Sequence, residues 1–348
     1  MKHLVLFGAT LVLAALVALA GCSSAAPAAQ PTKPAAGQGA AQPTSAPAAQ
    51  QAAAGSKFPS KGVEIIVGFD PGSGSDTTTR AFVPFLQKAL GQTVTVINQG
   101  GAGGALSWGN IAKAKPDGYT IGYLPMPSMQ NAAVLSKVEY DPLNSFDYLG
   151  MIAYDPVALA VKAGGPYKTL DDFIAAAQKD PGKVSIGATG KSSNDYTIGL
   201  SIQKAKNVKF NIVNFDGTPA GITAVMGDNL AAMGMNASNV LPYEKSGQLK
   251  TLAVGGDSRF PQLPDTPTFK EKGIALYVQG VYRGFMVPKG VPKDVYDTLV
   301  KAVKTASDDP EWKAAADKIA LPLMYIPPDQ TATLAKQLND AAKEYLTQ

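Results

Sequence analysis

Residues 63–90 read VEIIVGFDPGSGSDTTTRAFVPFLQKAL and combine three patterns. Residues 63–69 are rich in β-branched side chains, which predicts a strand. Residues 70–75 are rich in glycine and serine and predict a turn. Residues 76–90 place apolar side chains along one helical face, and Gly91 ends the helix. The stretch therefore predicts a strand, a tight turn and a helix in direct succession.

The same alternation recurs along the chain and predicts an α/β protein with mostly parallel sheets. The further predicted strands are 93–97, 119–124, 158–161, 184–187, 211–215, 230–235 and 249–254. The further predicted helices are 105–114, 170–179 (with Thr169 as N-cap), 196–205, 220–226, 294–307, 310–318 and 330–346. Repeated strand–loop–helix turns in two groups predict two lobes, with a ligand cleft at the carboxyl ends of the strands. The expected motion is hinge closure around the ligand.

The N-terminal residues predict export and a lipid anchor. Lys2 precedes an apolar run over 4–19 that is short for a membrane span, and the junction Leu-Ala-Gly-Cys ends at Cys22. This junction matches the bacterial lipobox, so we expect residues 1–22 to be a lipoprotein signal and Cys22 to carry the lipid. The alternative is an ordinary cleaved signal. Acyl-chain burial would hold the protein outside the cytoplasm on a bacterial membrane.

Residues 23–57 consist almost wholly of Ala, Pro, Gln, Gly, Ser and Thr. Such a segment buries too little apolar surface to offset its ordering entropy, which predicts a flexible tether. The remaining residues suffice for two domains. We assign 58–157 with 281–348 to lobe 1, and 158–280 to lobe 2.

Composition excludes several functions. The formal net charge is +4 without any basic run, so nucleic-acid binding has no support. His3 is the only histidine and Cys22 the only cysteine. Loss of the signal and lipidation would therefore remove Ser-His-Asp and Cys-His catalysis, and His- or Cys-based zinc sites. Carboxylate-pair or lysine chemistry stays open, although no suggestive acidic pair is visible. We predict a monomeric non-enzyme without cofactor or metal.

The first candidate binding loop is 72–77. Its glycines allow close backbone approach, and the following helix start offers free N–H groups to an anion. The hydroxyls of Ser73, Ser75 and Thr77 add donors. Asp76 is unsuited to direct anion contact, so we expect it to cap the turn by accepting backbone N–H bonds. The alternative is a plain strand–helix turn.

Two further loops have the same character. The loop 189–194 offers small donors, and its Lys191 could pair with a ligand carboxylate or simply face solvent. The loop 217–220 places Pro219 in the first turn of a helix. Three such loops around one cleft would form a cage of N–H and O–H donors. Arg283 is either a ligand clamp or a surface ion pair.

Two other features are assigned away from the site. Residues 100–104 resemble a phosphate-binding loop but lack the Gly-Lys-Ser/Thr ending, so a P-loop is not expected. Trp108 and Trp312 are predicted to pack in the core.

Several stretches resemble one known family over residues 58–348. They are VGFDPGSGSDTTTR (67–80), VINQGGAGG (96–104), KPDGYTIGY (115–123), VEYDPLNSFDYLG (138–150), FDGTPAGITAVMGDNL (215–230) and SGQLKTLAVGGDSRFPQLPDTPTFKEKG (246–273). Their order and spacing are similar to those of the substrate-binding receptors of tripartite tricarboxylate transporters, the Bug or TctC-like family.

The resemblance implies a two-lobed periplasmic-binding-protein fold (Venus flytrap, type II) and capture of a mono-, di- or tricarboxylate. It also implies delivery of that ligand to large and small integral membrane transporter subunits. Carried over by position, the implied contacts are Ser73, Gly74, Ser75, Gly190, Ser192, Ser193 and Thr218. Together with the loop analysis and neighbouring positions, the full predicted ligand set adds Asp76, Thr77, Met126, Asn194, Tyr196, Gly217 and Asn236.

Three departures from the family pattern bear on the ligand. Tyr196 stands where many members have His, Met235-Asn236 where an Asp-Asn pair is common, and 125–129 is more apolar than usual. They favour a ligand with an apolar or aromatic body. Two other functions remain open: a receptor presenting its ligand to a membrane sensor kinase, and a hydrolase using carboxylates.

Replacing Ser75 by Ala should weaken ligand binding about tenfold, because one charge-assisted hydrogen bond is lost. Calorimetric titration of both forms measures the change. An unchanged Kd would remove Ser75 from the site.

Overall fold

The computed structural model describes residues 58–347. The predicted signal (1–22), the lipidated Cys22 and the tether (23–57) lie outside these residues. Among the helices that the structure describes, none combines the length and apolar character needed to cross a bilayer.

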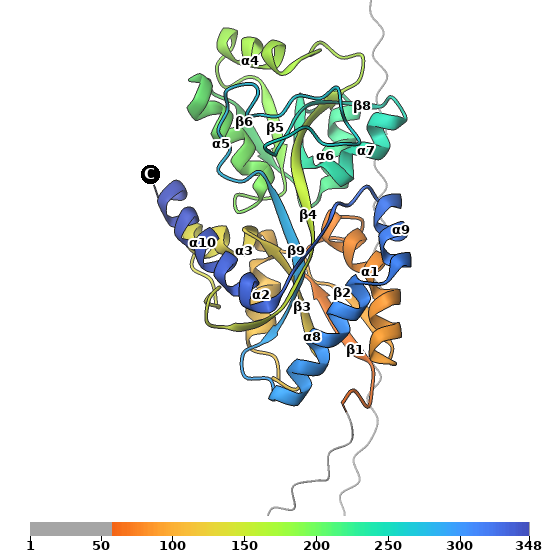
Figure 1. Ribbon diagram of the computed structural model, residues 1–348. Helices are drawn as coiled ribbons and strands as arrows, with labels where there is room; N and C mark the ends of the chain where they lie inside the picture. Colours follow the sequence, from red (N-terminus) through yellow and green to blue (C-terminus); the bar gives the residue numbers. More distant parts are fainter. Residues whose placement is uncertain (1–57, 348) are drawn as a thin grey trace, which may run out of the picture. The chain divides into compact units, whose positions relative to one another are not determined.

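The described chain contains ten strands, most of which alternate with helices (Figure 1). The strands are β1 (Val63–Val67), β2 (Val94–Asn98), β3 (Thr120–Met126), β4 (Phe146–Lys162), β5 (Ser185–Ala188), β6 (Asn211–Asn214), β7 (Ala232–Asn236), β8 (Leu249–Val254), β9 (Gly280–Pro288) and β10 (Leu323–Ile326). Their order is β2-β1-β3-β9-β4-β7-β5-β6, with β8 and β10 also paired to β4.

Strand β4 is the link between two groups of strands. Its first part pairs with β9 and β10, and its last part, from Val157 to Lys162, pairs with β7 and β8. Figure 1 shows β4 and β9 running between the helices of one group and those of the other. One continuous strand thus belongs to both lobes.

The expectation of mostly parallel sheets was wrong. Parallel pairing is confined to β1 with β2 and β3, and to β5 with β6 and β7. All pairs made by β4 and β9 are antiparallel. The reason is that these two strands run in opposite directions through the sheet and insert between the parallel units.

Ten α-helices are described, and they cover both faces of each group of strands. Their bounds are α1 (Gly74–Leu90), α2 (Ala105–Ala112), α3 (Ser128–Leu135), α4 (Leu170–Lys179), α5 (Asn194–Lys206), α6 (Thr218–Met226), α7 (Ala237–Lys245), α8 (Lys293–Ser307), α9 (Pro310–Lys318) and α10 (Pro328–Leu346).

Side-chain alternation along the strands separates the cores. In β1, Val63, Ile65 and Val67 face a cluster shared with α1, α8 and α9, whereas Ile66 faces one shared with α2, α3 and α10. The last part of β4 alternates in the same way between a cluster with α4 and α5 and one with α6 and α7. Both lobes are therefore three-layered, with helices on both faces.

Several local predictions are confirmed. Helix α1 ends at Gly91, which adopts the left-handed conformation that favours glycine. Helix α4 begins with a capping box in which Thr169 and Asp172 bond each other's backbone N–H groups. Trp108 and Trp312 are fully buried. These features are local, which is why sequence patterns suffice to place them.

Replacing Gly284 by Ala should destabilise the fold by about 1–3 kcal/mol or more, because the added methyl group would overlap the carbonyl oxygen of Gly150 where β9 pairs with β4. The matched control is Gly109→Ala within α2, whose methyl group would meet only Glu139 at an ordinary 3.5 Å. That change should be neutral or slightly stabilising. Urea unfolding of both variants measures the difference, and equal stabilities would contradict the prediction.

Candidate ligand-binding site

A cavity lies where five helices begin. It is lined by Phe69, Ser73, Gly74, Ser75, Pro125, Ser128, Thr189, Ser193, Asn194, Asp195, Gly217, Thr218, Asn236, Asn239, Val281 and Arg283. These residues include the first residues of α1, α3, α5 and α6, and the N-cap of α7. The first N–H groups of a helix lack partners within it. Side chains accept from those of Asp76, Tyr196 and Ser238, and the others are candidate donors to a ligand.

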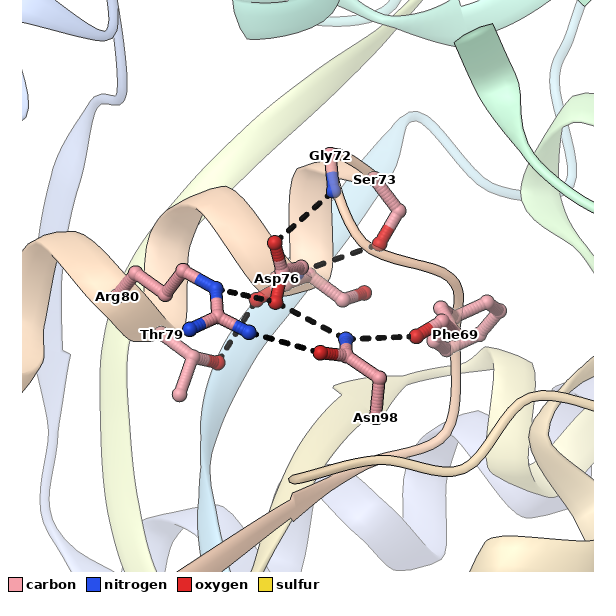
Figure 2. Close-up of polar contacts among 8 residues, drawn as sticks. Phe69, Gly72, Ser73, Asp76, Thr79, Arg80 and Asn98 are labelled. Atoms are coloured by element: carbon pink, nitrogen blue, oxygen red, sulfur yellow. Dashed lines mark hydrogen bonds and ion pairs between the residues drawn. The ribbon is translucent and has the colours of Figure 1, made fainter. Parts of the chain in front are cut away.

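Asp76 holds the first loop in shape (Figure 2). Its carboxylate accepts hydrogen bonds from the backbone N of Gly72 (2.9 Å), Arg80 Nε (2.8 Å) and Asn98 Nδ2 (2.9 Å). Ser73 caps α1 by accepting a bond from the N–H of Asp76. The expected capping role of Asp76 is confirmed. Its carboxylate is thereby occupied, which leaves the hydroxyls and backbone of 73–75 to face the cavity.

The second loop opens α5 in a similar way. Ser193 accepts a bond from the N–H of Tyr196 and serves as the N-cap. Two residues further on, Asp195 is 6% exposed and accepts a 2.6 Å hydrogen bond from Thr189 Oγ1. Burial raises the pKa of the Asp195 carboxyl to about 6, against the opposing influence of Thr189 and of the Arg283 charge. The cavity wall thus carries a carboxyl group that titrates near neutral pH.

Asn194, between these two residues, is 2% exposed and lines the same cavity. Neither its amide nitrogen nor its amide oxygen has a hydrogen-bond partner among residues 58–347. A buried polar group left unsatisfied costs roughly 1–3 kcal/mol. Such a group is therefore expected where a bound molecule supplies the missing partners.

A buried ion pair forms another part of the wall. Arg283 Nη2 lies 2.5 Å from Asp155 Oδ2, and Nη1 donates to Tyr123 Oη at 3.0 Å. The two charged side chains are almost wholly inaccessible to solvent. The Arg283 side chain is thus already neutralised by a carboxylate. The predicted surface ion pair is corrected, because β9 and β4 bury both partners; a ligand-clamp role remains a prediction.

The structure brings together eight of the predicted ligand residues and leaves six elsewhere. Those lining the cavity are Ser73, Gly74, Ser75, Ser193, Asn194, Gly217, Thr218 and Asn236. Those outside the lining are Asp76, Thr77, Met126, Gly190, Ser192 and Tyr196.

The physical reasons for these six positions differ. Met126 is fully buried among apolar residues of the α2–α3–α10 core, and Asp76 is occupied by its three partners. Gly190 and Ser192 turn toward a neighbouring groove beside α2 and α3, together with the exposed Lys191. Thr77 and Tyr196 are partly exposed and follow the lining residues in the first turns of α1 and α5.

Sequence reasoning missed Ser128, Asp195 and Asn239 as lining residues. Ser128 and Asn239 belong to the starts of α3 and α7, helices that were not predicted. A usable signal existed for Asp195, because an acidic residue directly follows the predicted donor loop in the first turn of the helix.

The fold and the cavity define a two-lobed solute-binding protein of the periplasmic type. Comparison with known proteins leads to its family. Residues 79–346 match the profile described as tripartite tricarboxylate transporter family receptor. The chain belongs to this family, which confirms the resemblance and implies a location outside the cytoplasm.

Individual relatives agree with this assignment. A UPF0065 protein from Cupriavidus necator is 29% identical over 281 residues, covering 81% of this chain and 85% of the relative. The periplasmic binding protein BugD superposes with a TM-score of 0.79 at 26% identity, covering 83% of this chain and 98% of BugD. MatC from Rhodopseudomonas palustris, solved with bound malate, superposes with a TM-score of 0.77 at 25% identity, over 82% of this chain and 99% of MatC.

Replacing Asp195 by Asn should change how stability depends on pH. The folded-state pKa of about 6 exceeds the ordinary value of 3.8, so the folded wild type holds its proton more tightly and loses stability as pH rises through this interval. The stability of D195N relative to wild type should therefore increase by about 2 kcal/mol between pH 4.5 and pH 8.

Chemical unfolding at the two pH values, without ligand, measures this difference. The control is Asp265→Asn, an exposed carboxyl with no side-chain hydrogen bond in the described structure, which should show no comparable increase. A relative stability of D195N that stays constant with pH would contradict the raised pKa.

Proposed function

We propose that this protein captures a small organic carboxylate and delivers it to an integral membrane transporter. The observation that carries the proposal is the convergence of five helix starts on one cavity. Each helix N-terminus carries the equivalent of roughly half a positive charge and presents free N–H donors. The arrangement favours a compact anion that accepts several hydrogen bonds at once.

The balance of charged side chains supports a small, reversibly bound ligand. Among residues 58–347, Arg283 is the only cationic residue lining the cavity, and Asp155 neutralises it. Attraction for the anion therefore comes from backbone dipoles and hydroxyl groups. A charge-assisted hydrogen bond contributes about 1.5–3 kcal/mol, so several of them, after association costs, reach the roughly −8 kcal/mol of micromolar binding.

Each of the two lobes contributes a hydroxyl group near a helix start to the cavity. Ser75 is the second residue of α1 and Thr218 the first of α6, and neither hydroxyl has a hydrogen-bond partner within residues 58–347. Both side chains are nearly buried at the cavity wall, with 9% and 7% exposure. Each hydroxyl is thus free to donate to a ligand oxygen.

Further parts of the proposal rest on the sequence and on the family. We assign residues 1–22 to a signal, Cys22 to lipid anchoring and 23–57 to a tether, so that the receptor works at a membrane surface. We also assign it a monomeric state. Residues 58–157 with 281–348 form lobe 1, and 158–280 form lobe 2, with a hinge in the strands between them. The malate bound to MatC supports a carboxylate ligand.

Binding rather than catalysis suits the side chains at the cavity. Within the described part of the chain, Asp195 is the one carboxyl group lining the cavity, and Asp155 is committed to Arg283 and Ser238. A carboxylate pair for acid–base chemistry would require two groups free to exchange protons with a substrate. The described cavity lining offers several hydrogen-bond donors but only one carboxyl group, Asp195, that is free to exchange a proton.

The double variant Ser75→Ala/Thr218→Val tests the donor cage. Each change removes one hydroxyl from a different lobe, so the losses should combine to about a hundredfold weaker carboxylate binding. Titration calorimetry of the purified full-length chain, with the carboxylate identified by mass spectrometry of copurifying molecules, measures it. Ser258→Ala, at an exposed position, should bind like wild type. Wild-type affinity in the double variant would place the ligand elsewhere.

A further inference from the structure

We infer that Asp195 is a specificity-determining residue, which selects carboxylates that also carry a hydrogen-bond donor, an ammonium or a hydroxyl group. The inference rests on the proposed function and narrows its ligand class. It follows from four properties of the cavity: the position of Asp195, its hydrogen bonds, the charges near it, and the unsatisfied amide beside it.

Asp195 is placed at the wall of the cavity. It stands in the first turn of α5, follows the N-cap Ser193, and lines the cavity although only 6% of it is exposed. Behind it lies Gly234 of β7, where even a methyl group would come within 2.9 Å of the Asp195 backbone oxygen. The close packing of β7 leaves the cavity side as the direction from which a partner can approach.

The hydrogen bonds of Asp195 leave acceptor capacity unused. Its Oδ2 accepts a hydrogen bond from Thr189 Oγ1, and the backbone N–H groups of Thr189 and Asp195 also favour the ionised carboxylate. An ionised carboxylate offers about four acceptor positions. Thr189 and the backbone thus supply fewer donors than the buried carboxylate can accept.

The charges facing Asp195 favour its ionised form at neutral pH. From β9, Arg283 acts on it at longer range and favours the ionised form, from the β5–α5 loop Thr189 donates to it, and β7 contributes the uncharged Gly234. The dipole of α5 acts in the same direction. A ligand carrying only carboxylates would place like charges together, whereas a donor group on the ligand would relieve the repulsion.

Asn194 supplies the complementary contact. Its amide nitrogen and oxygen are both buried and without partners, directly beside Asp195. A ligand with a carboxylate and an adjacent donor group satisfies both atoms at once: the carboxylate accepts from the amide N–H, and the donor group gives to the amide oxygen and to Asp195. A plain carboxylate satisfies only the nitrogen.

The test compares acids that differ only in one substituent. Three sets are titrated: propionate, lactate and alanine; succinate, malate and aspartate; glutarate, 2-hydroxyglutarate and glutamate, each chiral acid as both enantiomers. In wild type at pH 7.5, the best substituted acid should bind at least about tenfold more tightly than the unsubstituted acid of its set. In Asp195→Asn, this ratio should fall below about threefold.

The control for the substitution is Asp265→Asn, which should keep the wild-type ratio. Thermal unfolding and circular dichroism establish that D195N is folded. Should it not fold, the wild type itself provides the readout, because the ratio should shrink as pH falls from 7.5 to 5 and Asp195 takes up a proton. If the amino acids bind more tightly than the hydroxy acids, Asp195 makes an ionic contact with the ammonium group. If the two bind equally, Asp195 accepts a neutral hydrogen bond. Both outcomes support the inference.

Two results overturn the inference: an unsubstituted acid that binds wild type as tightly as its substituted partners, or a ratio that survives in D195N. Failure of the proposed function looks different. If none of the acids binds wild type at millimolar concentration, the carboxylate-receptor proposal falls and the inference falls with it. If they bind without discrimination, only the inference is lost.

Discussion

The buried pair of Asp155 on β4 and Arg283 on β9 ties together most of the elements that form the cavity. Arg283 also bonds Tyr123 of β3, and Asp155 accepts bonds from the N–H (3.2 Å) and Oγ (2.5 Å) of Ser238 in the first turn of α7. At Gly74, the start of α1, a methyl group would come within 2.8 Å of Arg283 Nη2. Removing one partner of such a pair typically costs 3–5 kcal/mol, because it leaves an uncompensated buried charge.

This ion pair also determines what kind of attraction the cavity can exert. A guanidinium paired with a carboxylate contributes little net charge, so under the proposed function helix N-termini and hydroxyl groups would hold the anion. Such donors are fixed in direction by the helices that carry them, and they bind strongly only when the acceptor oxygens match their positions. Selectivity then follows from geometry, and release of the ligand does not require breaking an ion pair between the receptor and its ligand.

Sequence patterns predicted the elements whose signals are local. The bounds of α4, α9 and β8 agree with the prediction, since a capping box, an Asp-Pro start and the short segment LKTLAV mark them within a few residues. Long-range features could not be predicted in this way. Gly150 and Pro156 interrupt the pattern of β4, so only its last part was predicted as a strand, and Pro242 obscured α7. Because helices α3 and α7 were not predicted, Ser128 and Asn239 were not predicted as lining residues. The donor loops at α1, α5 and α6 were predicted, because glycine and hydroxyl residues stand next to a helix start in each.

The residues hardest to explain by stability are those that best fit a ligand. Asn194 is buried with two unsatisfied polar atoms, and Asp195 is a carboxyl group kept largely ionised in a place that disfavours charge. Apolar side chains of similar size would make a more stable protein at both positions, because each would remove a desolvation cost. Five helix starts around these two side chains fit the inferred ligand, which has both acceptor and donor groups. Local instability of this kind also favours closure of the lobes on the ligand, since binding satisfies in one step the polar groups that the empty fold leaves without partners.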